Sequence, residues 1–199
     1  MAHKALIVID LQNDFCPGGA LAVAGGDEIV PLVNAMIDEF DHVVLTQDWH
    51  PEGHSSFASQ HDGKNPFESV SMPYGEQTLW PDHCVQGTRG AEFHAGLEWT
   101  KAELVVRKGF RKAIDSYSAF FENDHKTPTG LGGYLKERGI SDLTLVGLAT
   151  DFCVAYSAID AAKLGFQATV VMEGCRAIDL GGSLTEMTER MRQAGVSIG

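Results

Sequence analysis

Five short, almost uninterrupted runs of aliphatic and β-branched residues limit most strongly how this chain can fold. They occupy residues 5–9, 43–46, 104–107, 143–146 and 168–172. Apolar runs of this kind are typical of strands buried on both faces, which usually belong to a parallel sheet. Segments with helical spacing alternate with them, at 27–40, 130–138, 152–164 and 184–193. The alternation predicts an α/β fold, a three-layer doubly wound and mostly parallel sheet with helices on both faces.

The chain is long enough for one domain of ordinary size, and we expect a single domain over residues 1–199. One stretch, at about 49–93, has no sustained period and is rich in Gly, Pro, His and aromatic residues. Loops of this length inside a compact domain usually carry function. Its aromatic side chains let it bury itself, so we expect a folded lid or site wall.

The composition disfavours several kinds of partner. The formal charge is −12 with no basic cluster to offset it, which argues against nucleic acid and anionic membranes. No apolar stretch approaches membrane-spanning length, and the N-terminus lacks the features of a signal peptide. The four cysteines are scattered without a Cys-x-x-Cys pair. We therefore expect free thiols, a cytoplasmic location and a small-molecule partner, and leave open whether the protein is a homo-oligomer.

Four of the expected strands end at residues capable of chemistry. Asp10, Asp48 and Lys108 stand at the ends of the first three strands, and Cys153 lies just past the fourth. Ligands of open α/β sheets bind beyond the carboxyl ends of the strands. One such residue would be unremarkable as a helix cap or a solvated charge, but four at one edge of a sheet predict a site.

Cys153 stands where a strand pattern turns into a helical one. Backbone N–H groups at the start of a helix favour a thiolate, which is the nucleophilic form. Asp10 could take the thiol proton, and Lys108 between the two anions would relieve their repulsion and lower the thiol pKa. The trio could thus carry out acyl transfer without histidine. The alternative for Cys153 is a small core residue, and Lys112 competes with Lys108 but is not at the strand end.

A second group has the residue types of a metal site. Asp48 and His50 are two apart in an extended segment, so their side chains point the same way. His83, from the far part of the long loop, would complete a set suited to one divalent ion, Zn²⁺, Fe²⁺ or Mn²⁺. His54 is a candidate fourth ligand. The alternative is a solvated Asp-x-His pair.

Most of these residues fall in four motifs, which contain Asp10, Asp48, His50, His83 and Cys153. The motifs are Asp-Leu-Gln-Asn-Asp-Phe at 10–15, Thr-Gln-Asp-Trp-His-Pro at 46–51, Trp-Pro-Asp-His-Cys-Val-Gln-Gly-Thr at 80–88 and Gly-Leu-Ala-Thr-Asp-Phe-Cys-Val at 147–154. In this order they closely resemble the nicotinamidases (pyrazinamidases) of the isochorismatase-like cysteine hydrolase superfamily. The resemblance runs from residue 4 to about 196. It implies the isochorismatase-like hydrolase fold. It also implies hydrolysis of nicotinamide to nicotinate and ammonia through a cysteine thioester, with pyrazinamide accepted too.

The resemblance also implies a role for particular residues. The family's catalytic triad falls on Asp10, Lys108 and Cys153. Its oxyanion hole falls on the N–H groups of Ala149 and Cys153, after a cis peptide between Leu148 and Ala149. The ring of the substrate would lie between Phe15 and Trp80, with Tyr117 nearby and the ring nitrogen on the metal. The metal ligands would be Asp48, His50, His83 and, as a candidate, His54.

Three other functions are compatible with the sequence. A sister amidase of the superfamily would act on an N-carbamoyl or ureido compound, which lacks the ring nitrogen. A metallohydrolase would use metal-bound water in place of Cys153. A binding protein on the same scaffold would hold the ligand without hydrolysing it.

Overall fold

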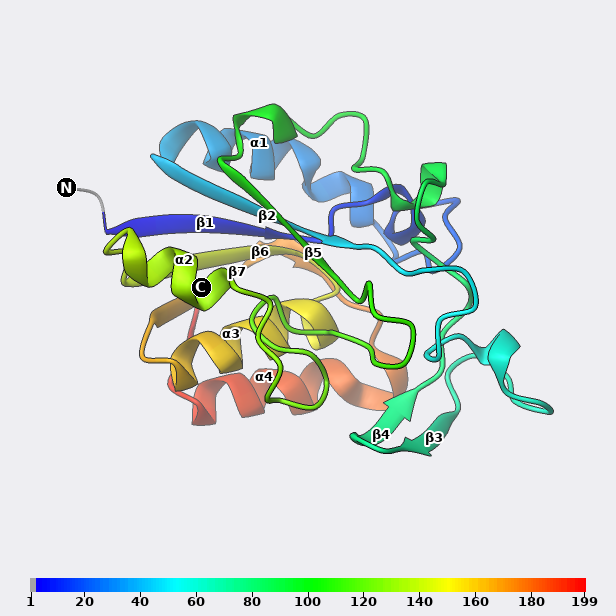
Figure 1. Cartoon of the computed structure of the whole chain (residues 1–199). Coiled ribbons are helices and arrows are strands. Elements are labelled where there is room, and N and C mark those ends of the chain that lie inside the picture. Colours follow the sequence, from blue (N-terminus) through cyan, green and yellow to red (C-terminus); the bar gives the residue numbers. More distant parts are fainter. Residues whose placement is uncertain (1–2) are drawn as a thin grey trace.

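A six-stranded parallel sheet forms the centre of the computed structural model, which describes residues 3–199 (Figure 1). Its strands lie in the order β5-β2-β1-β6-β7-β8, and every neighbouring pair is parallel. The strands are β1 (Lys4–Ile9), β2 (His42–Asp48), β5 (Leu104–Lys108), β6 (Asp142–Leu148), β7 (Gln167–Arg176) and β8 (Ser197–Ile198). The predicted mostly parallel sheet is confirmed.

Helices cover both faces of this sheet. Figure 1 shows α1 (Val30–Glu39) above the sheet, and α3 (Ala155–Lys163) and α4 (Ser183–Gln193) below it. A further helix, α2 (Leu131–Glu137), buries two leucines on its inner side. The three-layer arrangement agrees with the prediction. Among residues 3–199, none of the helices combines the length and apolarity needed to cross a membrane.

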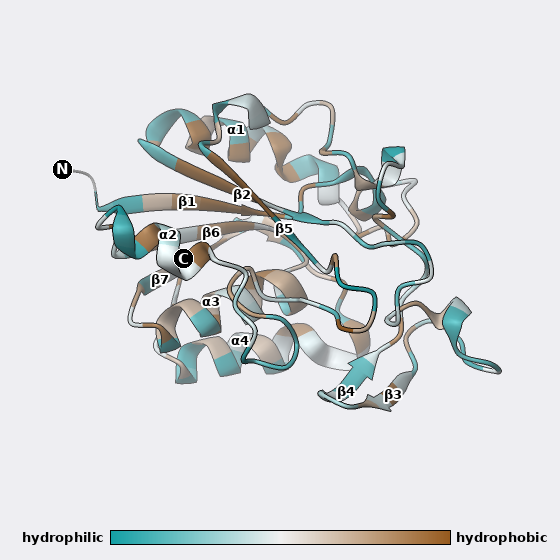
Figure 2. Ribbon diagram, in the orientation of Figure 1, coloured by the Kyte–Doolittle hydropathy of each residue, from teal (hydrophilic) through white to brown (hydrophobic). Residues whose placement is uncertain are grey.

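The apolar runs form the core because both faces of their strands are covered. Residues 5–9 of β1 have no exposed surface, and Figure 2 shows the central strands in the colour of hydrophobic residues. Burial of this kind contributes roughly 25 cal/mol per Å² of apolar surface removed from water. All four cysteines are free, as expected, and all four are buried.

Several elements differ from the expected ones. The segment 150–154 is a π-helical turn that leads into α3, so Cys153 is not in the first turn of an α-helix. The long loop contains an antiparallel hairpin, β3 (Ser69–Met72) and β4 (Gly75–Thr78), which has no apolar alternation to predict it. Strand β8 is two residues long, too short for a pattern. Short 3₁₀ turns span Asn13–Phe15, Gly26–Ile29, Ala58–Gln60, Arg89–Ala91, Trp99–Lys101 and Leu180–Gly182.

The strand order changes direction between β1 and β6. Chain connections run outward to β2 and β5 on one side and to β7 and β8 on the other. At such a switch point the loops diverge and leave a crevice beyond the carboxyl ends of the strands. The candidate residues lie at this edge.

Candidate active site

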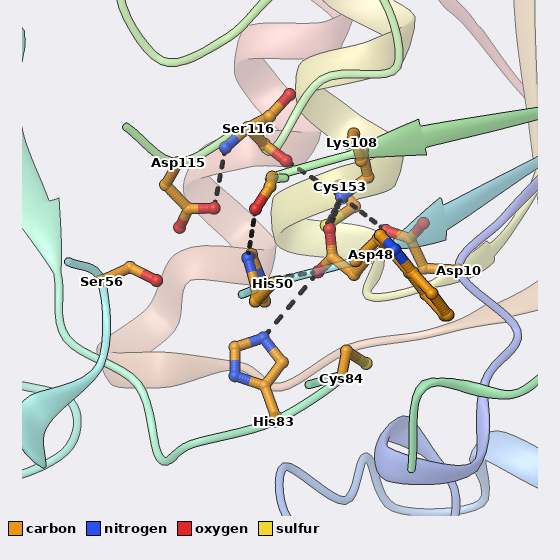
Figure 3. Close-up of polar contacts among 12 residues, drawn as sticks. Asp10, Asp48, His50, Ser56, His83, Cys84, Lys108, Asp115, Ser116 and Cys153 are labelled. Atoms are coloured by element: carbon orange, nitrogen blue, oxygen red, sulfur yellow. Dashed lines mark hydrogen bonds and ion pairs between the residues drawn. The ribbon is translucent and has the colours of Figure 1, made fainter. Parts of the chain in front are cut away.

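The four predicted strand ends meet at the switch point (Figure 3). Asp10 follows β1, Asp48 ends β2, Lys108 ends β5, and Cys153 follows β6. Because these four strands are neighbours, their ends carry the side chains together. All four are buried, and the carboxylate oxygens of Asp10 and Asp48 and the sulfur of Cys153 lie within 4.8 Å of one another.

Lys108 connects the members of this cluster. Its Nζ lies 2.8 Å from Asp10 Oδ2 and 2.5 Å from Asp48 Oδ1. It also donates to the Ser116 carbonyl at 2.9 Å and lies 3.4 Å from Cys153 Sγ. The contact with Asp48 was not predicted, because the sequence does not give the order of the strands. Lys112, the competing lysine, is exposed.

The ionisation of the cluster differs from the expectation at Cys153. Burial raises the thiol pKa well above its ordinary value, and although Lys108 acts to lower it, the Asp10 and Asp48 carboxylates raise it further. Burial also raises the pKa of Asp10, against the effect of Lys108. The ammonium is shared between two carboxylates, so it does not produce a resting thiolate. At rest, therefore, the sulfur is a thiol beside a buried carboxyl group that can accept its proton.

Thr46 fixes the orientation of Asp10. Its hydroxyl donates to Asp10 Oδ1 at 2.6 Å and accepts the Asp10 backbone N–H at 3.1 Å. Asp10 has a φ of 44°, in a region that non-glycine residues rarely occupy. These two bonds hold the carboxyl group with Oδ2 toward Lys108.

Asp48, His50 and His83 form the metal-type cluster. The Nε2 atoms of His50 and His83 lie 3.5 and 3.8 Å from Asp48 Oδ2. The Nδ1 atom of His50 lies 2.9 Å from the Gly109 carbonyl oxygen, and that of His83 lies 2.8 Å from the Pro81 carbonyl oxygen. A carbonyl accepts only an N–H, so both rings carry the proton on Nδ1 and direct the Nε2 lone pair toward Asp48.

The charge of Asp48 also suits a cation site. Burial acts to raise its pKa, but neighbouring groups, the Lys108 ammonium first among them, hold it well below the ordinary range. One carboxylate oxygen and two imidazole nitrogens thus converge within 4.8 Å of one another. This donor set fits a divalent transition metal and leaves coordination positions free for other ligands.

The structure does not bring His54 into that cluster. Its Nδ1 lies 2.8 Å from the Ser56 hydroxyl, and its Nε2 lies 3.0 and 3.1 Å from the carbonyls of Arg111 and Ile114. Both ring nitrogens are thus engaged with protein groups. The centroids of the His54 and His50 rings are 4.4 Å apart, so His54 packs against His50.

A pocket with an empty volume of about 320 Å³, including its opening, lies against the cluster. The three predicted aromatic residues, Phe15, Trp80 and Tyr117, line it together with Cys153 and Ala149. The peptide between Leu148 and Ala149 is cis, as the resemblance implied. A largely aromatic lining with a few polar groups suits a small planar ring.

Some pocket and supporting residues were missed by the sequence analysis. Those that line the pocket are Leu21, Asp115, Phe152 and Ile178. Gln12 was also missed: its carboxamide accepts the Asp48 N–H and donates to the Asp48 carbonyl, both at 2.8 Å. It stands two residues after Asp10 in the first motif, which was the available signal.

Comparison with known proteins places this architecture among the isochorismatase-like α/β hydrolases. The chain belongs to the isochorismatase family, because a family model of the isochorismatase domain matches residues 4–198. A nicotinamidase from Acinetobacter baylyi is 57% identical over 192 residues, which are 96% of this chain and 90% of the relative.

Two solved structures are informative. A nicotinamidase/pyrazinamidase from Acinetobacter baumanii superposes with a TM-score of 0.98 at 55% identity, covering 100% of this chain and 96% of that one. A pyrazinamidase from Pyrococcus horikoshii in complex with zinc superposes with a TM-score of 0.80 at 34% identity, covering 99% and 98%.

Proposed function

We propose that this protein is a nicotinamidase, which hydrolyses nicotinamide to nicotinate and ammonia and also accepts pyrazinamide. The observation that carries the proposal is the buried thiol of Cys153, which lies 3.4 Å from Lys108 and lines a small aromatic pocket beside the metal-type cluster. The similarity to the two Acinetobacter proteins supports the same reaction. The aromatic walls suit a planar ring, and Phe15 and Trp80 would enclose it.

In the first half of the reaction, the Cys153 sulfur attacks the carboxamide carbon and its proton passes to Asp10. Lys108 lies between the two groups and stabilises whichever of them is anionic. The backbone N–H groups of Ala149 and Cys153 would hold the oxyanion of the tetrahedral intermediate. When that intermediate collapses, Asp10 delivers the proton to the departing nitrogen, and ammonia leaves a thioester behind.

In the second half, water attacks the thioester carbon and gives a proton to Asp10. The C–S bond breaks and nicotinic acid forms, which releases its remaining proton to solvent and leaves as nicotinate. The sulfur recovers the proton from Asp10, which returns the site to a neutral thiol and a carboxylate. Burial raises the pKa of Asp10, which makes its carboxylate a better acceptor for the thiol proton.

Asp48, His50 and His83 would hold one divalent metal ion, Zn²⁺, Fe²⁺ or Mn²⁺, with His54 left outside the set. Bound there, the metal would supply a Lewis acid that receives the ring nitrogen and so orients the substrate. The relative from Pyrococcus horikoshii was solved in complex with zinc, which supports the binding of a divalent metal. The protein's part is to keep both Nε2 lone pairs directed inward through the Gly109 and Pro81 carbonyls.

An ammonia-release assay on nicotinamide, with and without a chelator, tests the proposal. The wild type should release ammonia, His83→Ala and the chelated enzyme should lose substrate affinity, and Cys153→Ala should be at least about 10³-fold slower. Activity that survives in Cys153→Ala but not in Asp48→Ala would instead indicate attack by metal-bound water. Turnover of a ureido substrate that resists chelation, without turnover of nicotinamide, would indicate a sister amidase.

A further inference from the structure

A buried glutamine joins the β3–β4 hairpin to the wall of the pocket. Among the eight residues of β3 and β4, all within the described chain, only Gln77 is buried, and it has no exposed surface. In Figure 1 the hairpin stands away from the central sheet, beyond the carboxyl ends of the strands. A fully buried carboxamide needs hydrogen-bond partners for its nitrogen and its oxygen. These partners identify the parts of the chain that Gln77 joins.

Its partners lie both on the hairpin and on the segment that carries the pocket wall. Within the hairpin, Gln77 Nε2 donates to the Thr78 carbonyl at 2.7 Å, and Gln77 Oε1 accepts from the Tyr74 hydroxyl at 3.2 Å. Gln77 Nε2 lies 2.8 Å from the Tyr117 hydroxyl and 3.1 Å from Asp115 Oδ2. Gln77 Oε1 accepts from Asn123 Nδ2 at 3.0 Å, and Asn123 Oδ1 in turn accepts the Tyr117 backbone N–H at 2.9 Å. Gln77 therefore binds Tyr117 at both ends, directly at the hydroxyl and through Asn123 at the backbone.

Tyr117 is one of three aromatic rings that meet edge to face around the pocket. Its ring centroid lies 6.2 Å from that of Trp80 and 5.6 Å from that of Phe152. Trp80 and Phe152 are themselves 4.9 Å apart at an angle of 87°. The neighbouring rings pack against the Tyr117 ring, and the contact with Gln77 fixes its hydroxyl end, so packing and hydrogen bond together set where this wall lies.

We infer that Gln77 is a positioning residue for the proposed reaction: its carboxamide fixes the Tyr117 wall and so sets how closely the pocket fits the substrate ring. The inference rests on the proposed nicotinamidase function. Gln77 does not line the pocket, so it acts through the pocket residues that it bonds, Tyr117 first and also Asp115. Its effect belongs in the binding of the ring and not in the chemistry at Cys153.

The test compares Gln77→Met, Tyr117→Phe and the double variant in steady-state ammonia release from nicotinamide. Methionine keeps the length of the side chain and removes its hydrogen bonds. Tyr117→Phe should raise KM about 3- to 10-fold, because one neutral hydrogen bond accounts for roughly that factor. Gln77→Met should raise KM at least as much, because it also loses the bonds to Asp115 and Asn123. Both variants should keep kcat within about twofold of wild type. The double variant should be no worse than the worse single variant, since both remove the same bond.

Gln60→Met is the matched control, because Gln60 is exposed on the same long loop and its carboxamide bonds only the neighbouring Ser59 side chain. It should have wild-type KM and kcat. A purely structural role for Gln77 would lower the active fraction, and thus the apparent kcat, at unchanged KM; that result would overturn the inference. If Gln77→Met fails to fold, a wild-type KM for Tyr117→Phe overturns it equally. Wild type that releases no ammonia would overturn the proposed function itself, whatever Gln77 does.

Discussion

At the scale of single residues, Lys108 decides the chemistry of the site. The sequence placed it at a strand end beside Asp10 and Cys153, but not against Asp48. That contact depends on β2 lying between β5 and β1, which a pattern of strands does not reveal. Likewise, the sequence suggested that Lys108 would lower the thiol pKa, whereas burial and two carboxylates raise it. The residue types of the site and the edge of the sheet at which they lie were predictable. The distances between their side chains and the direction of the Cys153 pKa shift were not.

Removing the Lys108 charge should damage both stability and activity. Lys108→Met leaves Asp10 and Asp48 buried without their cation, which costs about 3–5 kcal/mol of unfolding free energy. Ammonia release should fall at least about 10³-fold, because the thiol and the carboxylate lose their common counter-ion. Urea denaturation and the ammonia assay measure the two effects.

Lys112→Met is the control for that variant, since Lys112 is exposed and four residues away in the chain. It should change stability by no more than about 0.5 kcal/mol. Equal stability of the two variants would show that Lys108 does not compensate the two carboxylates.

At the scale of secondary structure, the ends of the strands and helices position the site. The five long strands and four helices were predictable from their apolar periodicity, because each buries a continuous face. The β3–β4 hairpin and the π-helical turn could not be predicted in this way. The hairpin depends on contacts such as those of Gln77, and the turn depends on the local geometry around Cys153. The π-helical turn contributes Phe152 and Cys153 to the lining of the pocket, and the hairpin bonds Tyr117 and Asp115 in that lining.

The turn after β5 has no room for a side chain at Gly109. A Cβ there would lie 2.4 Å from His50 Cε1, and the residue has a φ of 62°. Gly109→Ala should therefore displace the His50 ring and disturb the carbonyl that orients it. We expect metal affinity to fall about 10- to 100-fold, the usual cost of losing an outer partner of a ligand. Titration of the chelator-treated protein with Zn²⁺ measures this.

Gly133→Ala serves as the comparison, because a Cβ at Gly133 in α2 meets nothing within 4 Å. Its metal affinity should match wild type. Its stability should rise by up to about 1 kcal/mol, since alanine favours a helix over glycine. Wild-type metal affinity in Gly109→Ala would show that His50 does not depend on this turn.

At the scale of the whole molecule, the core encloses all four thiols. Burial raises the pKa of Cys16 to about 11 and that of Cys175 to about 12, and it raises those of Cys84 and Cys153 well above the ordinary value. The sequence predicted free cysteines and a buried parallel sheet. The burial of the four thiols could not be predicted, because it follows from the packing of helices on both faces of the sheet.

Alkaline pH should therefore destabilise the fold. Thiols of the unfolded chain ionise near pH 9.0, while the buried Cys175 thiol ionises only near pH 12. The stabilisation from a raised pKa is complete below pH 9.0 and is lost as the pH rises toward 12. The slope approaches about 1.4 kcal/mol per pH unit for each such thiol.

Urea denaturation at about pH 8 to 10 should show this decline in unfolding free energy, and Cys175→Ala should make it shallower. Loss of the thiol's packing lowers the unfolding free energy by the same amount at every pH, whereas loss of its ionisation changes the slope. The comparison of slopes therefore separates the two effects. An identical slope in wild type and variant would show that burial does not raise the pKa of Cys175.

The central claim is that Cys153 attacks the carboxamide of nicotinamide and carries its acyl group as a thioester. Rapid acid quenching during turnover, followed by mass spectrometry of the peptides, tests it directly. A nicotinoyl adduct on the peptide that contains Cys153, absent from Cys153→Ala, is the predicted result. No adduct at any quench time, together with wild-type ammonia release by Cys153→Ala, would contradict the account.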